Sequence, residues 1–343
     1  MSLIERIVAF EVPDAWLSFR DNAALGEHLA TLGCPFEAIG QSRNGQDLFG
    51  VTCGTGPHHV SVIAGSHADE PAGPMTAQIL PLALERLAPE LLERCTFRIV
   101  PQMNPDGADR NRAWFADPPA FATYIEHAVR EQPGDDIEFG FALDEGARPE
   151  CRAVLQWLAQ EAPYAAHSSL HGMGYAEGAW FLLCREWAER SGELMNQLAE
   201  ICERLRFPLH EIDRQGDKGF TRLRKGFSTT PTATAMQDFF HAQNDPAMAA
   251  KFRPSSMEAI AALGGNPLCM VSEMSLFRIT HGTSSLEDPI YWRFRDALAE
   301  ARASHALDAL QAEYGIEPVP FATQMRVQLA IVILAVKQAI SSL

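Results

Sequence analysis

Positive charge, long apolar runs and internal repeats are all scarce in this sequence, and each scarcity excludes a class of protein. The chain carries 28 Lys and Arg against 44 Asp and Glu, a formal net charge of −16. Such a surface repels a phosphate backbone, so we expect no general binding of nucleic acid. The longest apolar run near the C-terminus, residues 327–336, is shorter than the about 20 residues that span a bilayer. This run predicts a buried C-terminal helix, and we expect no membrane partner.

Signals of secretion and of a disulfide framework are also missing. Glu5 and Arg6 interrupt the short apolar stretch at the N-terminus, where a signal peptide would have a basic segment and then a long apolar one. The seven cysteines are widely scattered and contain no CxxC pair. An odd, dispersed set is typical of reduced thiols rather than of disulfides. The sequence therefore predicts a cytoplasmic protein without a signal peptide.

The composition is that of an ordinary folded protein. With 343 residues, 47% hydrophobic and 21% charged, the chain can bury a substantial core. It contains no internal repeat and no low-complexity tract. We expect a single domain over residues 1–343. The segment 213–266 differs from the rest, being rich in Gly, Arg, Thr and Pro at first and weakly helical later. We interpret it as a loop-and-helix insertion that borders the functional site, since loops of that length are often functional.

Strand and helix patterns alternate along the chain. Residues 60–65 form a short apolar run rich in β-branched residues, which predicts a buried strand, and helical patterns follow it from Pro71. Similar short runs recur at 96–101, 166–170 and 180–184. This alternation predicts an α/β fold with a mixed, largely parallel central sheet. In such sheets a ligand site lies beyond the carboxyl ends of the strands.

His67 and Glu70 follow the predicted strand 60–65 and are three residues apart. Imidazole and carboxylate groups both suit zinc, and a catalytic zinc site has three protein ligands and one open position. The pair can therefore converge on one cation. The alternative is a helix start on the surface, where acidic residues favour the helix dipole. We adopt that alternative for Asp69 and expect His67 and Glu70 to be metal ligands.

His171 and Glu273 are two further candidates. His171 follows the predicted strand 166–170, and the adjoining Gly172 allows close backbone approach, although a lone histidine there is more often structural. Glu273 interrupts an apolar strand, and a glutamate is rarely buried without a partner. Beside a metal-bound water it can act as a general base. The alternative is a structural salt bridge with Arg278.

Arg110, Asn111 and Arg112 form a polar group after the loop 104–107. Arginine binds carboxylates through two parallel hydrogen bonds, and the neighbouring amide adds a directed one. This combination suits recognition of a substrate carboxylate or stabilisation of an oxyanion. The alternative is that Asp106 and Asp109 simply pair with the arginines on a solvated loop.

Taken in order, these motifs resemble the zinc carboxypeptidase family, peptidase family M14. The stretch 65–73 is similar to that family's G-x-H-x-x-E-P-x-G block, and N-P-D-G, N-R, H-G and a late strand glutamate follow in family order. The resemblance implies a three-layer α/β/α fold and one Zn²⁺ held by His67, Glu70 and His171. It further implies that Asn111 and Arg112 bind the terminal carboxylate of the substrate and that Glu273 is the catalytic base.

The sequence departs from the family pattern in two places. The arginine that polarises the scissile carbonyl has no separate upstream position, so either Arg110 or an arginine of residues 214–225 is expected to serve. No tyrosine occurs between Tyr175 and Glu273, where the family has one ahead of the base. We therefore expect a metallocarboxypeptidase that cleaves an amide bond beside a free carboxylate, with the choice of substrate left open.

Two alternatives remain for the function. One is a zinc deacylase of N-acyl amino acids, similar to aspartoacylase and succinylglutamate desuccinylase, which the interval between Glu70 and His171 disfavours. The other is a non-catalytic metal- or peptide-binding module, which has no need of a base at Glu273. The substrate is expected to be a peptide or an acylated amino acid with a free carboxylate. Another divalent metal could replace zinc in the cell, and the sequence leaves the oligomeric state open.

Overall fold

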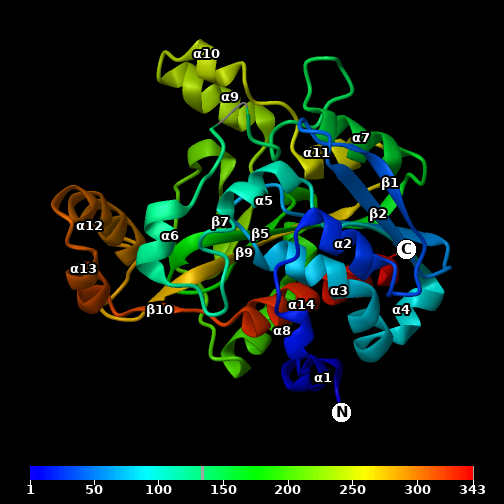
Figure 1. The fold of residues 1–343 in the computed structure, drawn as a ribbon, viewed down its shortest axis with the longest axis horizontal. Coiled ribbons are helices and arrows are strands. Elements are labelled where there is room, and N and C mark those ends of the chain that lie inside the picture. Colours follow the sequence, from blue (N-terminus) through cyan, green and yellow to red (C-terminus); the bar gives the residue numbers. More distant parts are fainter. Residues whose placement is uncertain (133–134, 343) are drawn as a thin grey trace.

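A single twisted sheet organises the computed structural model, which describes residues 1–132 and 135–342 (Figure 1). In the described residues its strands follow the order β1-β2-β4-β3-β5-β9-β6-β8-β7, with β10 on β9. The strands are β1 (Phe36–Gln41), β2 (Asp47–Cys53), β3 (His58–Ala64), β4 (Cys95–Val100), β5 (Tyr164–Ala176), β6 (Trp180–Leu183), β7 (Arg222–Arg224), β8 (Phe227–Thr229), β9 (Leu268–Ile279) and β10 (Ile316–Pro318). The four central strands β4, β3, β5 and β9 are parallel, and antiparallel pairs flank them on both sides. The predicted mixed, largely parallel sheet is confirmed.

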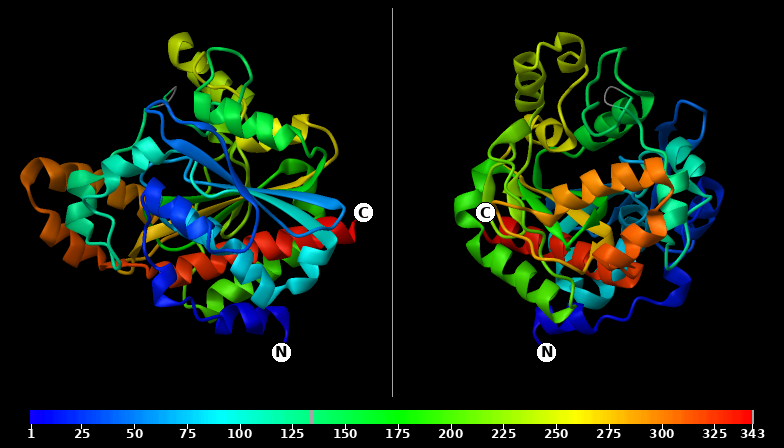
Figure 2. Two further views of the ribbon diagram at one scale, coloured as in Figure 1. Left: turned by 45° about the vertical axis from the view of Figure 1, so that its right-hand side comes forward. Right: turned by 90° about the vertical axis from the view of Figure 1, so that its left-hand side faces the viewer.

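Helices cover both faces of this sheet. One face packs against α3 (Ala72–Leu87) and α14 (Phe321–Ser341), with α8 (Gly192–Arg204) packed on α14 and α1 (Leu3–Ala9) against all three helices. The other face packs against α7 (Pro149–Ala159) and α11 (Ser256–Ala262). Val62 and Ile63 of β3 point into these two separate cores, as alternation along a strand requires. The three-layer arrangement is visible in the turned views (Figure 2).

Shorter helices complete the fold around this frame. They are α2 (Asn22–Leu29), α4 (Pro89–Arg94), α5 (Pro105–Asn111), α6 (Phe121–His127), α9 (Ala233–Ala242), α10 (Pro246–Ala249), α12 (Ile290–Ser304) and α13 (Leu307–Tyr314). The predicted C-terminal helix is confirmed, and residues 327–336 are buried within α14. Across residues 1–132 and 135–342, no helix combines the length and the hydropathy that a membrane crossing requires.

A proline lies in the interior of one of the helices that cover the sheet. Pro81 lies inside α3, which continues through it and ends at Leu87. A proline inside a helix costs about 3 kcal/mol. Nearly every side chain of α3 is buried, so the burial of apolar surface outweighs that cost. Elsewhere, a short 3₁₀ helix (Arg185–Arg190) precedes α8.

The segment expected to be a loop at 104–107 is instead the start of a helix. Asn104 caps α5 by accepting a hydrogen bond from the backbone N–H of Gly107 at 2.9 Å, and Pro105 occupies the first helical turn. Arg110 and Asn111 therefore lie in the last turn of α5, and Arg112 is its C-cap residue.

Residues 213–266 border the carboxyl-end side of the sheet. Their strands β7 and β8 extend the sheet beyond β6, while α9 and α10 stand away from it at the top of Figure 1. Several of their side chains line the cavity described below. Whether the segment is an insertion into a single domain stays a prediction.

Candidate metal centre and active-site cavity

His67, Glu70 and His171 come together at the carboxyl ends of β3 and β5. Nδ1 of His67 lies 2.8 Å from Oε1 of Glu70 and 3.0 Å from Nδ1 of His171. Nδ1 of His171 lies 3.0 Å from Oε2 of Glu70. One donor atom from each residue thus faces a single point, and the three form a group that could hold a metal ion.

The turn after β3 places His67 and Glu70 at this point. Gly65 has φ +75°, a conformation that residues with a side chain rarely adopt. A Cβ atom at this position would lie 2.1 Å from the side-chain oxygen of Gln102. Only glycine therefore fits where the chain leaves β3 and turns toward α3.

His171 reaches the same point from within a strand. It was expected just beyond a strand end, but β5 continues through it to Ala176. Because Ala64 and Leu170 are neighbours in the register of β3 and β5, the residues that follow them lie side by side. The backbone N–H of Gly172 donates to Glu70 Oε2 at 3.0 Å and holds the carboxylate toward the histidines.

The other ring nitrogens of both histidines face carboxylates. Nε2 of His171 lies 3.0 Å from Oε2 of Glu138 and 2.8 Å from Oγ of Ser169. Nε2 of His67 lies 3.6 Å from Oδ2 of Asp136. A carboxylate behind a histidine fixes the tautomer that presents the front nitrogen to a metal. The donor set and its supporting groups therefore fit a divalent metal of the zinc type, with Nδ1 of each histidine as the ligand atom.

Glu273 lies beside this group on the neighbouring strand. It is the register partner of His171 in the parallel pair of β5 and β9, and it lines the same cavity. Burial, reinforced by the negative charge of Glu70, raises the pKa of Glu273 to about 8. A carboxyl group with that environment can take up and release a proton near neutral pH.

A cavity of about 500 Å³ opens in front of these residues. Its apolar wall consists of strand residues and side chains of the segment 213–266. These are Trp180, Leu182, Phe220, Pro231, Met236, Phe240, Phe252, Met257 and Val271. Arg214 and Lys218 supply positive charge on the same side, whereas Asp136 and Glu138 supply negative charge near the histidines. The cavity thus offers an apolar chamber with a cationic rim.

Sequence reasoning missed Arg130, which enters the cavity from the stretch after α6. Its Nη1 atom lies 2.9 Å from Glu70 Oε1 and 3.4 Å from Asp69 Oδ1. Nothing in the local pattern around Arg130 signalled a site. Asp69, expected at a surface helix start, is instead buried beside this arginine.

Three tyrosines also line the cavity, namely Tyr124, Tyr175 and Tyr291. None lies between positions 175 and 273, where a tyrosine was sought in the sequence. Tyr291 comes from α12, after Glu273 in the chain, so only the fold brings it to the cavity. The sequence offered no signal for it beyond its residue type.

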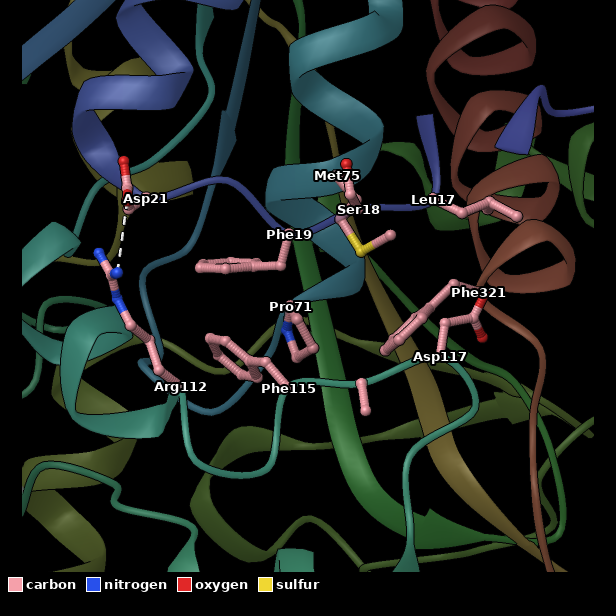
Figure 3. Close-up of a pocket in the computed structure, with 11 residues that line it drawn as sticks. Leu17, Ser18, Phe19, Asp21, Pro71, Met75, Arg112, Phe115, Asp117 and Phe321 are labelled. Carbon is pink, nitrogen blue, oxygen red and sulfur yellow. Dashed lines mark hydrogen bonds and ion pairs between the residues drawn. The ribbon is translucent and has the colours of Figure 1, made fainter. Parts of the chain in front are cut away.

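The structure does not bring Arg110, Asn111 and Arg112 into this cavity. Arg112 pairs with Asp109 at 2.7 Å and with Asp21 at 3.3 Å. It lines a separate hollow beside Phe115, at some remove from the histidines, and Figure 3 shows its side chain directed toward Asp21. Arg110 pairs with Glu131 at 2.7 Å on the surface.

Asn111 is fully buried and has no free hydrogen-bonding atom. Its Nδ2 atom donates to the carbonyl oxygens of Gly107 and Val129 at 3.0 and 2.9 Å. Its Oδ1 atom accepts from the indole N–H of Trp114 and from the backbone N–H of Val129, both at 2.8 Å. Substrate binding by residues 110–112 therefore stays a prediction. The contacts of these three residues do not support it, because their polar atoms pair with other residues of the protein.

Comparisons with known proteins agree with the motifs and the fold. Residues 34–117 match the sequence model of the Peptidase_M14 family, described as zinc carboxypeptidase. The resemblance inferred from the motifs around His67 and Glu70 is therefore confirmed. No curated protein sequence matches the chain significantly.

Solved structures extend the likeness to nearly the whole chain at the level of fold. Bovine thrombin-activatable fibrinolysis inhibitor, solved with tick carboxypeptidase inhibitor, is 13% identical with TM-score 0.56, covering 96% of this chain and 100% of its own. A candidate metallopeptidase from Shewanella amazonensis SB2B is 15% identical with TM-score 0.53, covering 92% and 91%. A metallo-carboxypeptidase from Burkholderia cenocepacia is 15% identical with TM-score 0.51, covering 93% and 68%. At such identities the likeness shows a shared fold.

Proposed function

We propose that this chain, which is similar to the zinc carboxypeptidases in sequence over residues 34–117 and in fold over most of its length, is a zinc-dependent hydrolase of carboxypeptidase type. It would hold one Zn²⁺ per chain through His67, Glu70 and His171. The observation that carries the proposal is the convergence of these three donor atoms next to Glu273. A non-catalytic binding module would not need a carboxylate at that place.

The proposed roles follow from the contacts. When bound, the ion would polarise the scissile carbonyl and lower the pKa of a bound water. Glu273 would accept a proton from the attacking water and pass it to the leaving amine. Glu138 and Asp136 would hold the two imidazole rings in the orientation that faces the ion. Arg130, rather than Arg110, is placed to contact the scissile carbonyl oxygen, since it lines the cavity.

The substrate carboxylate has a better partner in Arg214 than in Arg112. Arg214 lines the cavity, contacts Asp217 at 3.2 Å and stacks over Phe220. Its Nε atom is buried and has no hydrogen-bond partner among the described residues. Lys218 lies near it, over the ring of Phe239. We therefore assign the free carboxylate of the substrate to the rim formed by Arg214 and Lys218.

The apolar wall indicates the side chain that the substrate carries. Leu182, Met236, Met257 and Val271 offer no charge to a cationic or acidic side chain. Burying a large apolar side chain contributes about 1.5–3 kcal/mol. We therefore expect a preference for peptides that end in a large apolar or aromatic residue.

The test combines metal analysis with hydrolysis. Purified protein would be analysed for metal and assayed with peptides whose C-termini are free or amidated, and with N-acyl amino acids. Zinc near one per chain and cleavage of free-carboxylate peptides only would support the proposal. Cleavage of N-acyl amino acids alone would favour the deacylase. Absence of bound metal after supply of zinc would refute the ligand assignment.

Two arginine variants test which of the two arginines, Arg214 or Arg112, binds the free carboxylate of the substrate. Arg214→Ala should raise KM for free-carboxylate peptides by about 10-fold or more, since a charge-assisted hydrogen bond contributes roughly 1.5–3 kcal/mol. Arg112→Ala is the matched control, because it removes the same side chain outside the cavity, and it should leave KM unchanged. The reverse result would show that Arg112 binds the substrate carboxylate, as the sequence alone predicted.

A further inference from the structure

Two pairs of cysteine thiols meet across neighbouring strands of the sheet. Phe36 and Val51 are register partners in the hairpin of β1 and β2, and the backbone N–H of Thr52 donates to the carbonyl of Pro35 at 2.9 Å. The next residues outward, Cys34 and Cys53, are therefore directly opposite each other. In the second pair, Leu183 and Met270 are partners in β6 and β9, which places Cys184 opposite Cys269.

The geometry of the first pair suits a disulfide. Pro35 and Thr52 share a backbone hydrogen bond, and in a regular antiparallel ladder the pair beyond a hydrogen-bonded pair has Cα atoms about 4.5 Å apart. Disulfides span Cα separations of about 4.4–6.8 Å. Both side chains belong to the same face, since Cys53 is part of the larger core and Cys34 packs against that core. Both cysteines are free thiols in this structure.

Accessibility distinguishes the two pairs. Cys34 is partly exposed, whereas Cys53 is buried. The neighbouring Cys53 thiol, as a hydrogen-bond donor, lowers the pKa of Cys34, which favours the thiolate form of Cys34. Cys184 and Cys269 are both buried, and the backbone N–H of Cys269 donates to Cys184 Sγ at 3.3 Å. The second pair therefore has two neighbouring thiols, but neither of its cysteines is exposed to solvent as Cys34 is.

We propose that Cys34 and Cys53 form a peroxide-reactive dithiol site, with Cys34 as the attacking thiolate and Cys53 as the resolving thiol. The Cys34 sulfur attacks a peroxide oxygen and the O–O bond breaks, which leaves hydroxide that takes a proton. Cys34 is thereby oxidised to a sulfenic acid, and the peroxide is reduced by two electrons. Cys53 then attacks the sulfenic sulfur, so that the S–S bond forms, the S–O bond breaks and water leaves.

The test is peptide mapping by mass spectrometry after the native, full-length protein is treated with hydrogen peroxide. The expected product is a cross-linked peptide pair containing Cys34 and Cys53, lighter by two hydrogen atoms and restored by dithiothreitol. Cys184 and Cys269 in the same sample are the internal control and should remain alkylatable thiols. Equal oxidation of the buried pair, or the absence of any Cys34–Cys53 link, would overturn the proposal.

Serine variants separate the two roles. Cys53→Ser should leave Cys34 as a sulfenic acid that dimedone captures, whereas Cys34→Ser should abolish capture and leave Cys53 reduced. Cys184→Ser should behave as the wild type. If Cys34→Ser still allows Cys53 to react at the wild-type rate, the assignment of Cys34 as the attacking thiol is wrong. None of these readouts depends on hydrolytic activity, so a failed peptidase assay leaves them intact.

Discussion

At the scale of single residues, burial and neighbouring charge decide what each ionisable side chain can do. Glu70 is buried between two histidines and Arg130, and these partners lower the pKa of its carboxyl despite the opposing effect of burial. Glu273, on the adjoining strand, has the opposite shift because burial dominates there. Glu70 and Glu273 are therefore prepared for different tasks, one as a charged ligand and one as a proton carrier.

The first prediction concerns Glu273. Glu273→Gln keeps the shape of the side chain but cannot accept a proton, so kcat/KM should fall by about 10²–10⁴-fold. Metal content should stay at the wild-type level, because the donor atoms of His67, Glu70 and His171 are untouched. The measurement is steady-state kinetics paired with elemental analysis. A variant that loses its metal along with its activity would show that Glu273 contributes to binding the ion instead.

A second prediction concerns stability and pH at His167. Its ring is buried on β5 between the hydroxyls of Ser61 and Ser256, and burial lowers its pKa to about 3. In the unfolded chain a histidine takes up a proton below a pH of about 6.5, whereas the folded protein does not. The neutral ring of His167 therefore contributes its full stabilisation of the fold above a pH of about 6.5. That stabilisation is lost as the pH falls toward the pKa of His167 in the folded protein.

Between pH 7 and pH 5 this single group should cost the wild type about 2 kcal/mol of unfolding free energy. Urea unfolding at both pH values would measure the loss. The control is His167→Gln, which keeps a polar side chain between the serines but does not titrate, and its loss should be smaller by that amount. An equal loss in both proteins would mean that other groups cause the acid sensitivity.

At the scale of elements, the turn between β3 and α3 controls the metal ligands. Strand β3 ends at Ala64, and the chain reaches Glu70 within a few residues because Gly65 adopts a left-handed conformation against Gln102. Strand β5 carries His171 along one side of β3, and β9 carries Glu273 along the far side of β5. The site is therefore assembled from one turn and two strand interiors.

The third prediction tests this turn. Gly65→Ala introduces a Cβ atom only 2.1 Å from Gln102 and places alanine at φ +75°. A strained backbone of this kind costs of order 1–3 kcal/mol, and the shift of His67 should weaken zinc binding. Zinc titration and thermal unfolding would measure both effects. Gly192→Ala is the control, since nothing lies within 4 Å of its Cβ position. Equal zinc affinity in both variants would show that the turn does not set the ligand geometry.

At the scale of the whole molecule, the site joins parts of the chain that are far apart in sequence. The cavity is lined by Tyr124 and Arg130, by residues of strands β5, β6 and β9, by side chains of the segment 213–266 and by Tyr291 of α12. A ligand at this place contacts many elements at once. Anything that binds only the folded state stabilises it by mass action.

The fourth prediction is therefore the effect of removing the metal. Chelation should lower the unfolding temperature, since zinc at a thousand times its Kd contributes about 4 kcal/mol to the folded state. Differential scanning calorimetry with and without a chelator, followed by re-addition of zinc, would measure the loss and its recovery. His67→Ala should unfold at the same temperature with and without zinc. A zinc response retained in that variant would place the ion at a different site.

The sequence by itself determined the α/β class, the proximity of His67 and Glu70, and the carboxylate at Glu273. These follow from signals that a few neighbouring residues carry: a β-branched run, a turn after it, and a charge within an apolar strand. The tertiary structure alone decided that Arg130 and Tyr291 line the cavity and that Arg112 does not, and it selected Arg214 from the arginines of residues 214–225 that the sequence had offered. Sheet order and helix packing bring distant segments together, and a local pattern carries no record of which segments those are. Residues 110–112 show the consequence, because Arg110 pairs with Glu131 and Arg112 pairs with Asp109, outside the cavity.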